Sequence, residues 1–326
     1  MHTAVTEISV AAVFVCITGY MFYYYFGYFY NISLELYCYH KYKKKERIYM
    51  AYPKILTIQD ISCVGQCSLT VALPIISACG IETCVLPSAV LSTHTAGFSG
   101  YTFRDLTEDM PAIKDHWVKE NIKFDAVYTG YLGSTKQIEY VADIFKANGT
   151  ENCVKIVDPA MADNGKLYPG FDTEFVAAMK KLCGEADYII PNITEAAFLT
   201  DIEYKAEYDR KYIDDILAGL SELGCRNIIL SGVSYREGKT GIVVYENGLY
   251  SYYEHDKLPN SCHGTGDIYA SAFTGALVRG KTAFEAAKIA ADYTVECIKA
   301  TAEEENHWYG AKFEPVLIKL INALNQ

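Results

Sequence analysis

Short apolar runs alternate with longer amphipathic stretches along most of the chain. The apolar runs contain few interspersed polar residues, which is typical of strands buried on both faces of a sheet. They predict strands at residues 54–59, 81–86, 125–129, 154–157, 188–190 and 226–230.

Between these runs, apolar residues recur at helical spacing. They predict helices at 68–79, 104–120, 135–147, 173–183, 212–223, 266–278, 283–299 and 314–324. Two further strands, 240–245 and 249–253, flank Asn247-Gly248, a pair that favours a tight hairpin turn. This alternation predicts a doubly wound, mostly parallel α/β sheet with helices on both faces.

The first 49 residues differ in character from the rest. Residues 8–30 contain no charged side chain and are long enough to span a membrane as a helix. A basic run at 40–47 follows, and the positive-inside rule would then place the rest of the chain in the cytoplasm. The alternative is that Met50 begins a cytoplasmic enzyme and that residues 1–49 are non-native upstream translation. With both alternatives open, we predict an N-terminal extension at 1–49 and one domain at 50–326.

Composition narrows the class of protein. Lys and Arg total 29 against 40 Asp and Glu, and the net charge of −11 argues against nucleic acid as the main partner. The 11 cysteines are odd in number and scattered, which indicates reduced cytoplasmic thiols rather than a disulfide framework or a zinc site. An acidic protein can still bind ATP, because ATP needs only a local anion site and a metal ion.

The motif with the most chemical content is Gly264-Thr265-Gly266-Asp267, at the start of a predicted helix. Glycines there let backbone N–H groups converge on an anion, and the helix N-terminus adds partial positive charge. A carboxylate in the first turn is placed to take a proton from an attacking hydroxyl while those N–H groups hold a phosphoryl group. The alternative is that Asp267 only caps the helix.

Two familiar nucleotide motifs are excluded. A dinucleotide fingerprint needs a third glycine near residue 269, where Tyr269 stands, and it needs a strand–helix–strand unit near the chain start. The chain also has no Gly-x-x-x-x-Gly-Lys-Ser/Thr phosphate loop.

Six motifs, taken in order and spacing, resemble those of the ribokinase-like superfamily and its pyridoxal/pyridoxamine kinase branch. The resemblance covers about residues 54–300 and implies a ribokinase-like α/β/α fold. It further implies an ATP- and Mg²⁺-dependent kinase that phosphorylates the 5′-hydroxymethyl group of a B6 vitamer. The motifs are Ile58-Gln59-Asp60, Ser92-Thr93-His94-Thr95, residues 129–134, Asp158-Pro159, Asn192-Ile193-Thr194-Glu195 and Gly264-Thr265-Gly266-Asp267.

The resemblance implies roles at the phosphate-transfer end. Asp267 would be the catalytic base, with Gly264, Thr265 and Gly266 as the anion hole, and Asp158 and Glu195 would organise Mg²⁺. The residues implied to bind ATP are Asp158, Tyr168, Asn192, Glu195, Ser231 and Gly232. A homodimer is implied as well, and a monovalent cation such as K⁺ is left open. A simpler alternative for Asn192 and Glu195 is a capping box at a helix start.

On the acceptor side, the resemblance implies that the substrate ring contacts Asp60, Cys67, Leu91, Thr95 and Tyr131. The pair Asp60-Ile61 departs from the Ser-His of well-known pyridoxal kinases. A carboxylate there favours a protonated pyridine nitrogen or an amine, as in pyridoxamine or an aminopyrimidine. Hydroxymethylpyrimidine kinase, with the same fold, and a non-catalytic B6-binding protein remain alternatives. Tyr131 has a core residue as its alternative, and His94 is expected to be a structural hydrogen bonder.

Overall fold

The computed structural model describes residues 52–326 apart from 247, 260, 261 and 305. The predicted extension 1–49, with its candidate membrane segment 8–30, and the turn residue Asn247 therefore lie outside the described residues. Among the helices of the described part, none has the length and apolar composition needed to cross a membrane.

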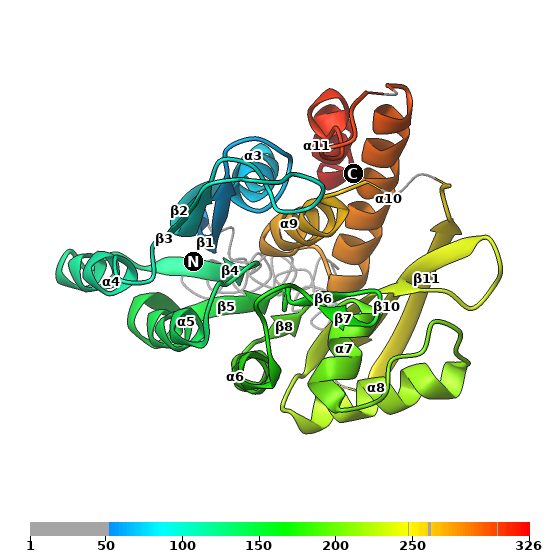
Figure 1. The fold of residues 1–326 in the computed structure, drawn as a ribbon, viewed down its shortest axis with the longest axis horizontal. Coiled ribbons are helices and arrows are strands. Elements are labelled where there is room, and N and C mark those ends of the chain that lie inside the picture. Colours follow the sequence, from blue (N-terminus) through cyan, green and yellow to red (C-terminus); the bar gives the residue numbers. More distant parts are fainter. Residues whose placement is uncertain (1–51, 247, 260–261, 305) are drawn as a thin grey trace, which may run out of the picture. The chain divides into compact units, whose positions relative to one another are not determined.

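One large, mostly parallel sheet runs through the domain (Figure 1). Within the described residues its strand order is β11-β10-β9-β8-β5-β4-β1-β2-β3. The six strands from β9 to β2 pair in parallel, whereas β10, β11 and the short edge strand β3 are antiparallel. The bounds are β1 Lys54–Ser62, β2 Glu82–Leu91, β3 Phe103–Asp105, β4 Phe124–Thr129, β5 Gly149–Val157, β8 Tyr188–Ile189, β9 Asn227–Val233, β10 Lys239–Glu246 and β11 Leu249–Asp256.

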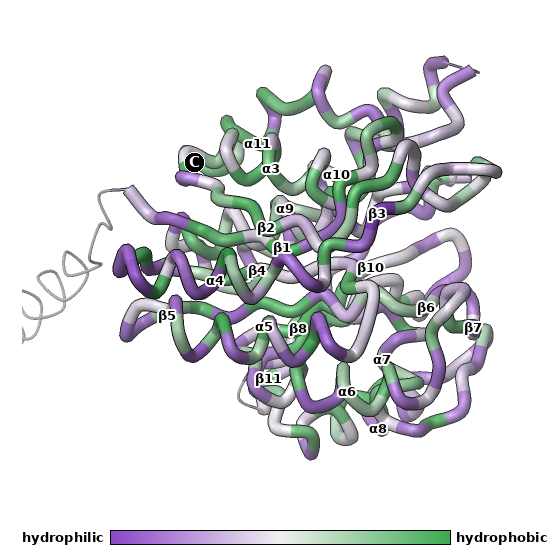
Figure 2. Tube along the Cα trace, turned by 60° about the vertical axis from the view of Figure 1, so that its left-hand side comes forward, coloured by the Kyte–Doolittle hydropathy of each residue, from purple (hydrophilic) through white to green (hydrophobic). Residues whose placement is uncertain are grey.

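Helices cover both faces of this sheet and bury two separate apolar cores against it (Figure 1). One face carries α3 Leu69–Ala78, α9 Thr265–Val278, α10 Ala283–Ala302 and α11 Leu317–Leu324. The other carries α4 Met110–Lys119, α5 Thr135–Asn148, α6 Thr173–Gly184, α7 Ile193–Thr200 and α8 Arg210–Glu222. Hydrophobic residues follow the central strands, whereas the outer turns of α4 are hydrophilic (Figure 2). The predicted three-layer α/β/α architecture is confirmed.

The predicted elements differ from the structure mainly at their ends and in short segments. The predicted helix 104–120 begins only at α4, because Phe103–Asp105 pairs with the end of β2 as an edge strand. Helix α7 was not predicted, nor was the small hairpin of β6 Ala162–Asp163 and β7 Lys166–Leu167. The hairpin of β10 and β11 is confirmed, with Glu246 paired to Leu249.

The sheet brings most of the predicted site residues to one edge. In a parallel sheet the carboxyl ends of the strands lie along the same edge, where ligands of α/β proteins usually bind. Asp60 lies near the end of β1, Tyr131 follows β4, Asp158 follows β5, and Asn192 follows β8. Ser231 lies near the end of β9 in the same row.

Candidate active site

The start of α9 is shaped by Gly264, which is the N-cap residue of the helix with φ 78°. This left-handed conformation is readily adopted by glycine. A Cβ atom here would also collide with the backbone carbonyl of Gln66, in the loop that precedes α3. The loop before α9 and the β1–α3 loop therefore pack backbone to backbone.

Asp267 lies in the first turn of α9, and no side chain caps this helix. The N-cap position is occupied by Gly264, so Asp267 is not the N-cap residue. Burial raises the pKa of Asp267 to about 7; a hydrogen bond from the Ser68 backbone opposes this rise, and the charge of Asp60 adds to it. A carboxylate with such a pKa is suited to accept a proton near neutral pH.

Asp60 is buried at the end of β1 and faces the same region. Its Oδ2 accepts a hydrogen bond from the Ser62 hydroxyl at 3.0 Å. Burial raises the pKa of Asp60, and the hydroxyl groups of Ser68 and Ser62 partly offset that rise. Cys67 lies near both carboxylates, since burial, then Asp267, then Asp60 raise the pKa of its thiol. The Cys67 thiol is therefore uncharged near neutral pH.

Ser68 is a residue that sequence reasoning missed. It has φ 55°, which is uncommon for a residue other than glycine and is often found at functional sites. A hydrogen bond from its backbone lowers the pKa of Asp267, and one from its hydroxyl lowers the pKa of Asp60. Because backbone strain of this kind leaves no mark in a single sequence, the residue types alone could not have identified it.

Asn192 and Glu195 form a capping box at the start of α7. The Asn192 side chain accepts the Glu195 N–H at 2.9 Å, and Glu195 Oε2 accepts the Asn192 N–H at 2.9 Å. Glu195 Oε1 also accepts the Met161 N–H at 3.2 Å, and Asn192 Nδ2 donates to the Ala162 carbonyl at 2.9 Å. The capping box is therefore present, and it holds the Glu195 carboxylate next to the loop after β5.

Asp158 and Glu195 are both buried and lie close together. Burial, the charge of Glu195 and the charge of Asp267 raise the pKa of Asp158 well above its usual range. Burial raises the pKa of Glu195 to about 8, although backbone N–H groups oppose the rise. Buried carboxylates that repel one another favour a bound cation, and carboxylate oxygens suit Mg²⁺.

Two carboxylates alone do not complete a metal shell. Within the described part of the chain, no group of three or more His, Cys, Asp or Glu side chains could hold a metal ion. Mg²⁺ characteristically binds through one or two carboxylates together with water and substrate phosphates. Asp158 and Glu195 fit that mode, in which the nucleotide brings the remaining ligands.

The nucleotide-side residues predicted from the sequence lie at neighbouring strand ends. Ser231 forms a parallel bridge with Asn192, and its N–H donates to the Pro191 carbonyl at 3.0 Å. Gly232, the next residue, is exposed and has φ 77°. Tyr168 follows β7 and is 38% exposed, and burial and the charge of Glu195 raise its pKa.

The residues predicted to contact the acceptor differ from one another in burial and position. The Tyr131 ring is partly buried, with its centroid 5.5 Å from that of Phe171, and burial and the charge of Asp60 raise its pKa to about 12. Leu91 is buried at the end of β2. Thr95 is exposed.

His94 is a structural hydrogen bonder. Its Nδ1 accepts the Ala96 N–H at 3.2 Å, so the proton is on Nε2, which donates to the Tyr309 carbonyl at 2.7 Å. The same C-terminal segment reaches Gln66, whose amide donates to the Glu314 carboxylate at 2.8 Å. The segment after α10 is thus bonded to the loops that carry His94 and Gln66, a contact that the sequence motifs did not predict.

A family model described as phosphomethylpyrimidine kinase matches residues 73–312, well over half of the chain. The chain belongs to this family. Pyridoxal kinases are among the relatives of this chain, so the predicted ribokinase-like membership is confirmed. The carboxylates and the glycine-rich turn described above lie within or just before the matched residues.

Three relatives illustrate the similarity. A candidate phosphomethylpyrimidine kinase from Bacteroides thetaiotaomicron is 37% identical, covers 84% of this chain and 96% of its own, and superposes with a TM-score of 0.80. Another crystal form of that protein contains pyridoxal. The pyridoxal kinase of Lactobacillus plantarum is 31% identical over 84% of this chain and 98% of its own, with a TM-score of 0.77. The pyridoxal kinase of Dictyostelium discoideum is 28% identical over 249 residues, which cover 71% of this chain and 80% of the relative.

Proposed function

We propose that the protein transfers the γ-phosphate of ATP to the 5′-hydroxymethyl group of a B6 vitamer. The observation that carries the proposal is Asp267, a buried carboxylate with a pKa raised to about 7, which lies in the first turn of α9 just after the N-cap residue Gly264. Asp267 takes the hydroxyl proton as the acceptor oxygen bonds to the γ-phosphorus. The bond from that phosphorus to the bridging oxygen breaks, and ADP leaves with its electron pair.

The proposed anion-hole residues contribute to phosphoryl transfer through the position of their backbone N–H groups. Backbone N–H groups at Gly264, Thr265 and Gly266 point along the helix start, where they stabilise the charge that develops on the transferring group. The close packing of Gly264 on Gln66 supports this role, because it holds the loop in one conformation. Asp158 and Glu195 would hold Mg²⁺, which supplies charge neutralisation at the phosphates when bound. A monovalent cation such as K⁺ would have the same acidic surroundings available.

A B6 vitamer is favoured as acceptor by the Bacteroides relative that was crystallised with pyridoxal. Asp60 further supports a substrate that offers a positive charge or an N–H donor, as pyridoxamine does. The second candidate is hydroxymethylpyrimidine kinase, which the description of the family model favours and whose aminopyrimidine would also suit a carboxylate. A non-catalytic B6-binding protein fits less well, because a pure binder has no use for a base beside an anion hole.

We further propose that residues 50–326 are the catalytic domain and that it acts in the cytoplasm as a homodimer. Residues 1–49 are either an N-terminal anchor or upstream translation without a role. The activity of residues 50–326 expressed alone, compared with the full chain, decides whether the extension contributes to catalysis.

The proposal is tested by phosphorylation of four acceptors with Mg·ATP and the purified full chain. The acceptors are pyridoxamine, pyridoxal, pyridoxine and 4-amino-5-hydroxymethyl-2-methylpyrimidine. We expect kcat/KM for at least one vitamer to exceed that for the pyrimidine by about tenfold or more. A preference for the pyrimidine would support the second candidate, and transfer to none of the four would contradict the proposal.

A further inference from the structure

Gln137 is a buried amide in the first turn of α5 that joins three segments on the acceptor side. Its side chain is 1% exposed, although glutamine is mostly found at protein surfaces. Its Oε1 accepts the Gly133 N–H at 2.7 Å. Its Nε2 donates to the Ser88 carbonyl at 3.0 Å and to the Thr107 hydroxyl at 2.8 Å. The carbonyl oxygen and the amino group of the side chain are thus both paired without solvent.

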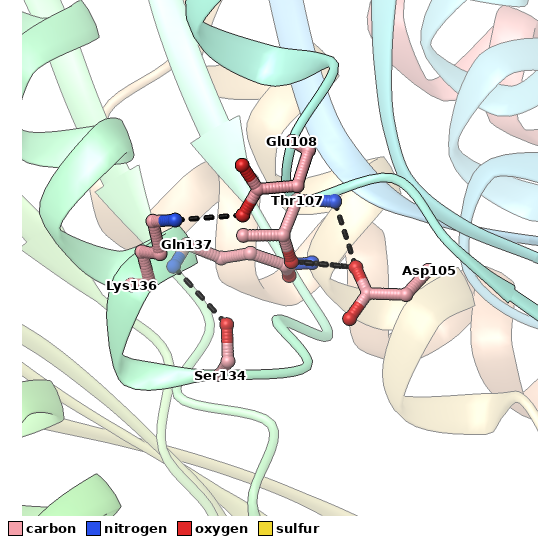
Figure 3. Close-up of polar contacts among 6 residues, drawn as sticks. All are labelled: Asp105, Thr107, Glu108, Ser134, Lys136 and Gln137. Atoms are coloured by element: carbon pink, nitrogen blue, oxygen red, sulfur yellow. Dashed lines mark hydrogen bonds and ion pairs between the residues drawn. The ribbon is translucent and has the colours of Figure 1, made fainter.

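The orientation of this amide is fixed by Asp105, in the edge strand β3 (Figure 3). Asp105 Oδ1 accepts both the N–H of Thr107, at 2.7 Å, and its hydroxyl, at 2.5 Å. Because the hydroxyl proton of Thr107 is committed to Asp105, its oxygen is left to accept from Gln137. A flipped amide would place its carbonyl oxygen against two acceptors, so only one orientation is stable.

The same network holds both ends of the segment that carries Tyr131. Gln137 binds the N–H of Gly133 directly. Ser88, whose carbonyl accepts from Gln137, donates its hydroxyl to the Tyr131 carbonyl at 3.2 Å. The Tyr131 backbone is therefore tied to β2, and the chain two residues later is tied to α5. The Tyr131 ring packs against that of Phe171.

We propose that Gln137 is a positioning residue for the acceptor, because it fixes the loop that presents Tyr131 to the substrate ring. The inference rests on the proposed function, in which Tyr131 contacts that ring. The nucleotide-side residues lie in or after other strands, β5, β7, β8 and β9, and within the described residues no hydrogen bond joins them to this network. Loss of the network therefore acts on acceptor binding and leaves ATP binding intact.

The first test compares Gln137→Met with Lys136→Gln. Methionine keeps the size of the side chain but leaves the Gly133 N–H without a partner. It also removes one of the two hydrogen bonds to the Ser88 carbonyl, which keeps only the one from the Leu106 N–H. We expect the acceptor KM to rise by about tenfold and the KM of ATP to change by less than about twofold. Lys136 is the neighbouring residue, and its exposed ion pair with Glu108 at 2.6 Å contributes little (Figure 3). The Lys136→Gln variant should therefore keep both KM values.

The second test uses Gln137→Glu, which keeps the shape and makes the contact titratable. When protonated, the new carboxyl group can accept from Gly133 and donate one hydrogen bond. When ionised, it cannot donate, and it faces the nearby Asp105 carboxylate, which lies 3.4 Å from Nε2 of the native residue. The ratio of acceptor KM in this variant to that in wild type should therefore rise by about fivefold or more between pH 6 and pH 9.

Ser88→Ala removes only the hydrogen bond to the Tyr131 carbonyl. This variant tests the inference if Gln137→Met fails to fold. It should raise the acceptor KM by about threefold, with the KM of ATP unchanged. An unchanged acceptor KM in folded Gln137→Met and Ser88→Ala, with only a lower Tm, would overturn the inference. Wild-type turnover of a vitamer separates this outcome from failure of the proposed function, which would abolish turnover in every variant alike.

Discussion

Asp60, near the end of β1, and Asp267, in the first turn of α9, lie close enough for the charge of Asp60 to raise the pKa of Asp267. Burial is the larger cause of that raised pKa, and the two carboxylates also act together on the thiol of Cys67. The residue proposed to recognise the acceptor is therefore coupled to the residue proposed to deprotonate it.

This coupling predicts the pH dependence of the enzyme. With a pKa of about 7, Asp267 is protonated and inactive as a base below neutral pH, so kcat/KM for the acceptor should fall as the pH drops through 7. Asp60→Asn removes the like charge, so the acidic limb should move to lower pH. The measurement is kcat/KM for pyridoxine from pH 5 to 9 on both proteins. Identical acidic limbs would mean that Asp60 does not act on the base.

A second prediction concerns the choice of vitamer. Asp60→Ser should cost pyridoxamine about 1–3 kcal/mol of transition-state stabilisation, the usual size of a charge-assisted hydrogen bond. Pyridoxine, whose corresponding group is a neutral hydroxyl, should lose less. The values of kcat/KM for both vitamers on wild type and variant measure this difference. Equal losses would indicate that Asp60 binds a group common to all vitamers or supports the loop.

A third prediction concerns the metal site. With its pKa raised to about 8, Glu195 is mostly protonated in the free protein at pH 7. A cation favours the ionised forms of Glu195 and of Asp158, whose pKa is also raised, so binding of Mg·ADP should release protons at pH 7, about one of them from Glu195, and fewer at pH 9. Calorimetry in two buffers of different ionisation enthalpy measures the release. Glu195→Gln should release about one proton fewer at pH 7, and an equal release from the variant would remove Glu195 from the metal site.

A fourth prediction uses two glycines with similar backbones. Gly264 and Gly280 have φ of 78° and 85°, but only Gly264 has backbone packed where a Cβ would lie. Both alanine variants should lose about 1 kcal/mol of stability through the left-handed backbone. Gly264→Ala should in addition lower kcat by about a hundredfold, because the anion hole must shift. Equal kcat values for the two variants would show that this close packing has no catalytic role.

The sequence predicted the parts of the site that depend on the order of elements. Buried strands and amphipathic helices predicted the doubly wound sheet, and the sheet placed Asp60, Asp158 and Asn192 at one edge. The sequence did not predict helix α7, because its eight residues carry too little periodicity. The sequence did not predict strand β3 either, because its three exposed residues carry no strand pattern.

The remaining features depend on contacts between distant residues. The positive φ of Ser68 and the bond from His94 to the Tyr309 carbonyl arise from packing between segments far apart in the chain. The burial of Gln137 is another such case, since a glutamine in a helix start is normally exposed. Residue types alone carry no signal for these relationships.

The central claim is that Asp267 is the base in phosphoryl transfer to a B6 vitamer. Asp267→Asn keeps the size of the side chain but removes the proton acceptor. The most direct measurement is the rate at which pyridoxamine 5′-phosphate forms from pyridoxamine and Mg·ATP, together with the Kd of ATP, for wild type and variant. We predict that kcat falls by about 10²–10⁴-fold while the Kd of ATP stays within about twofold. A variant whose kcat remains within about threefold of wild type would contradict the claim.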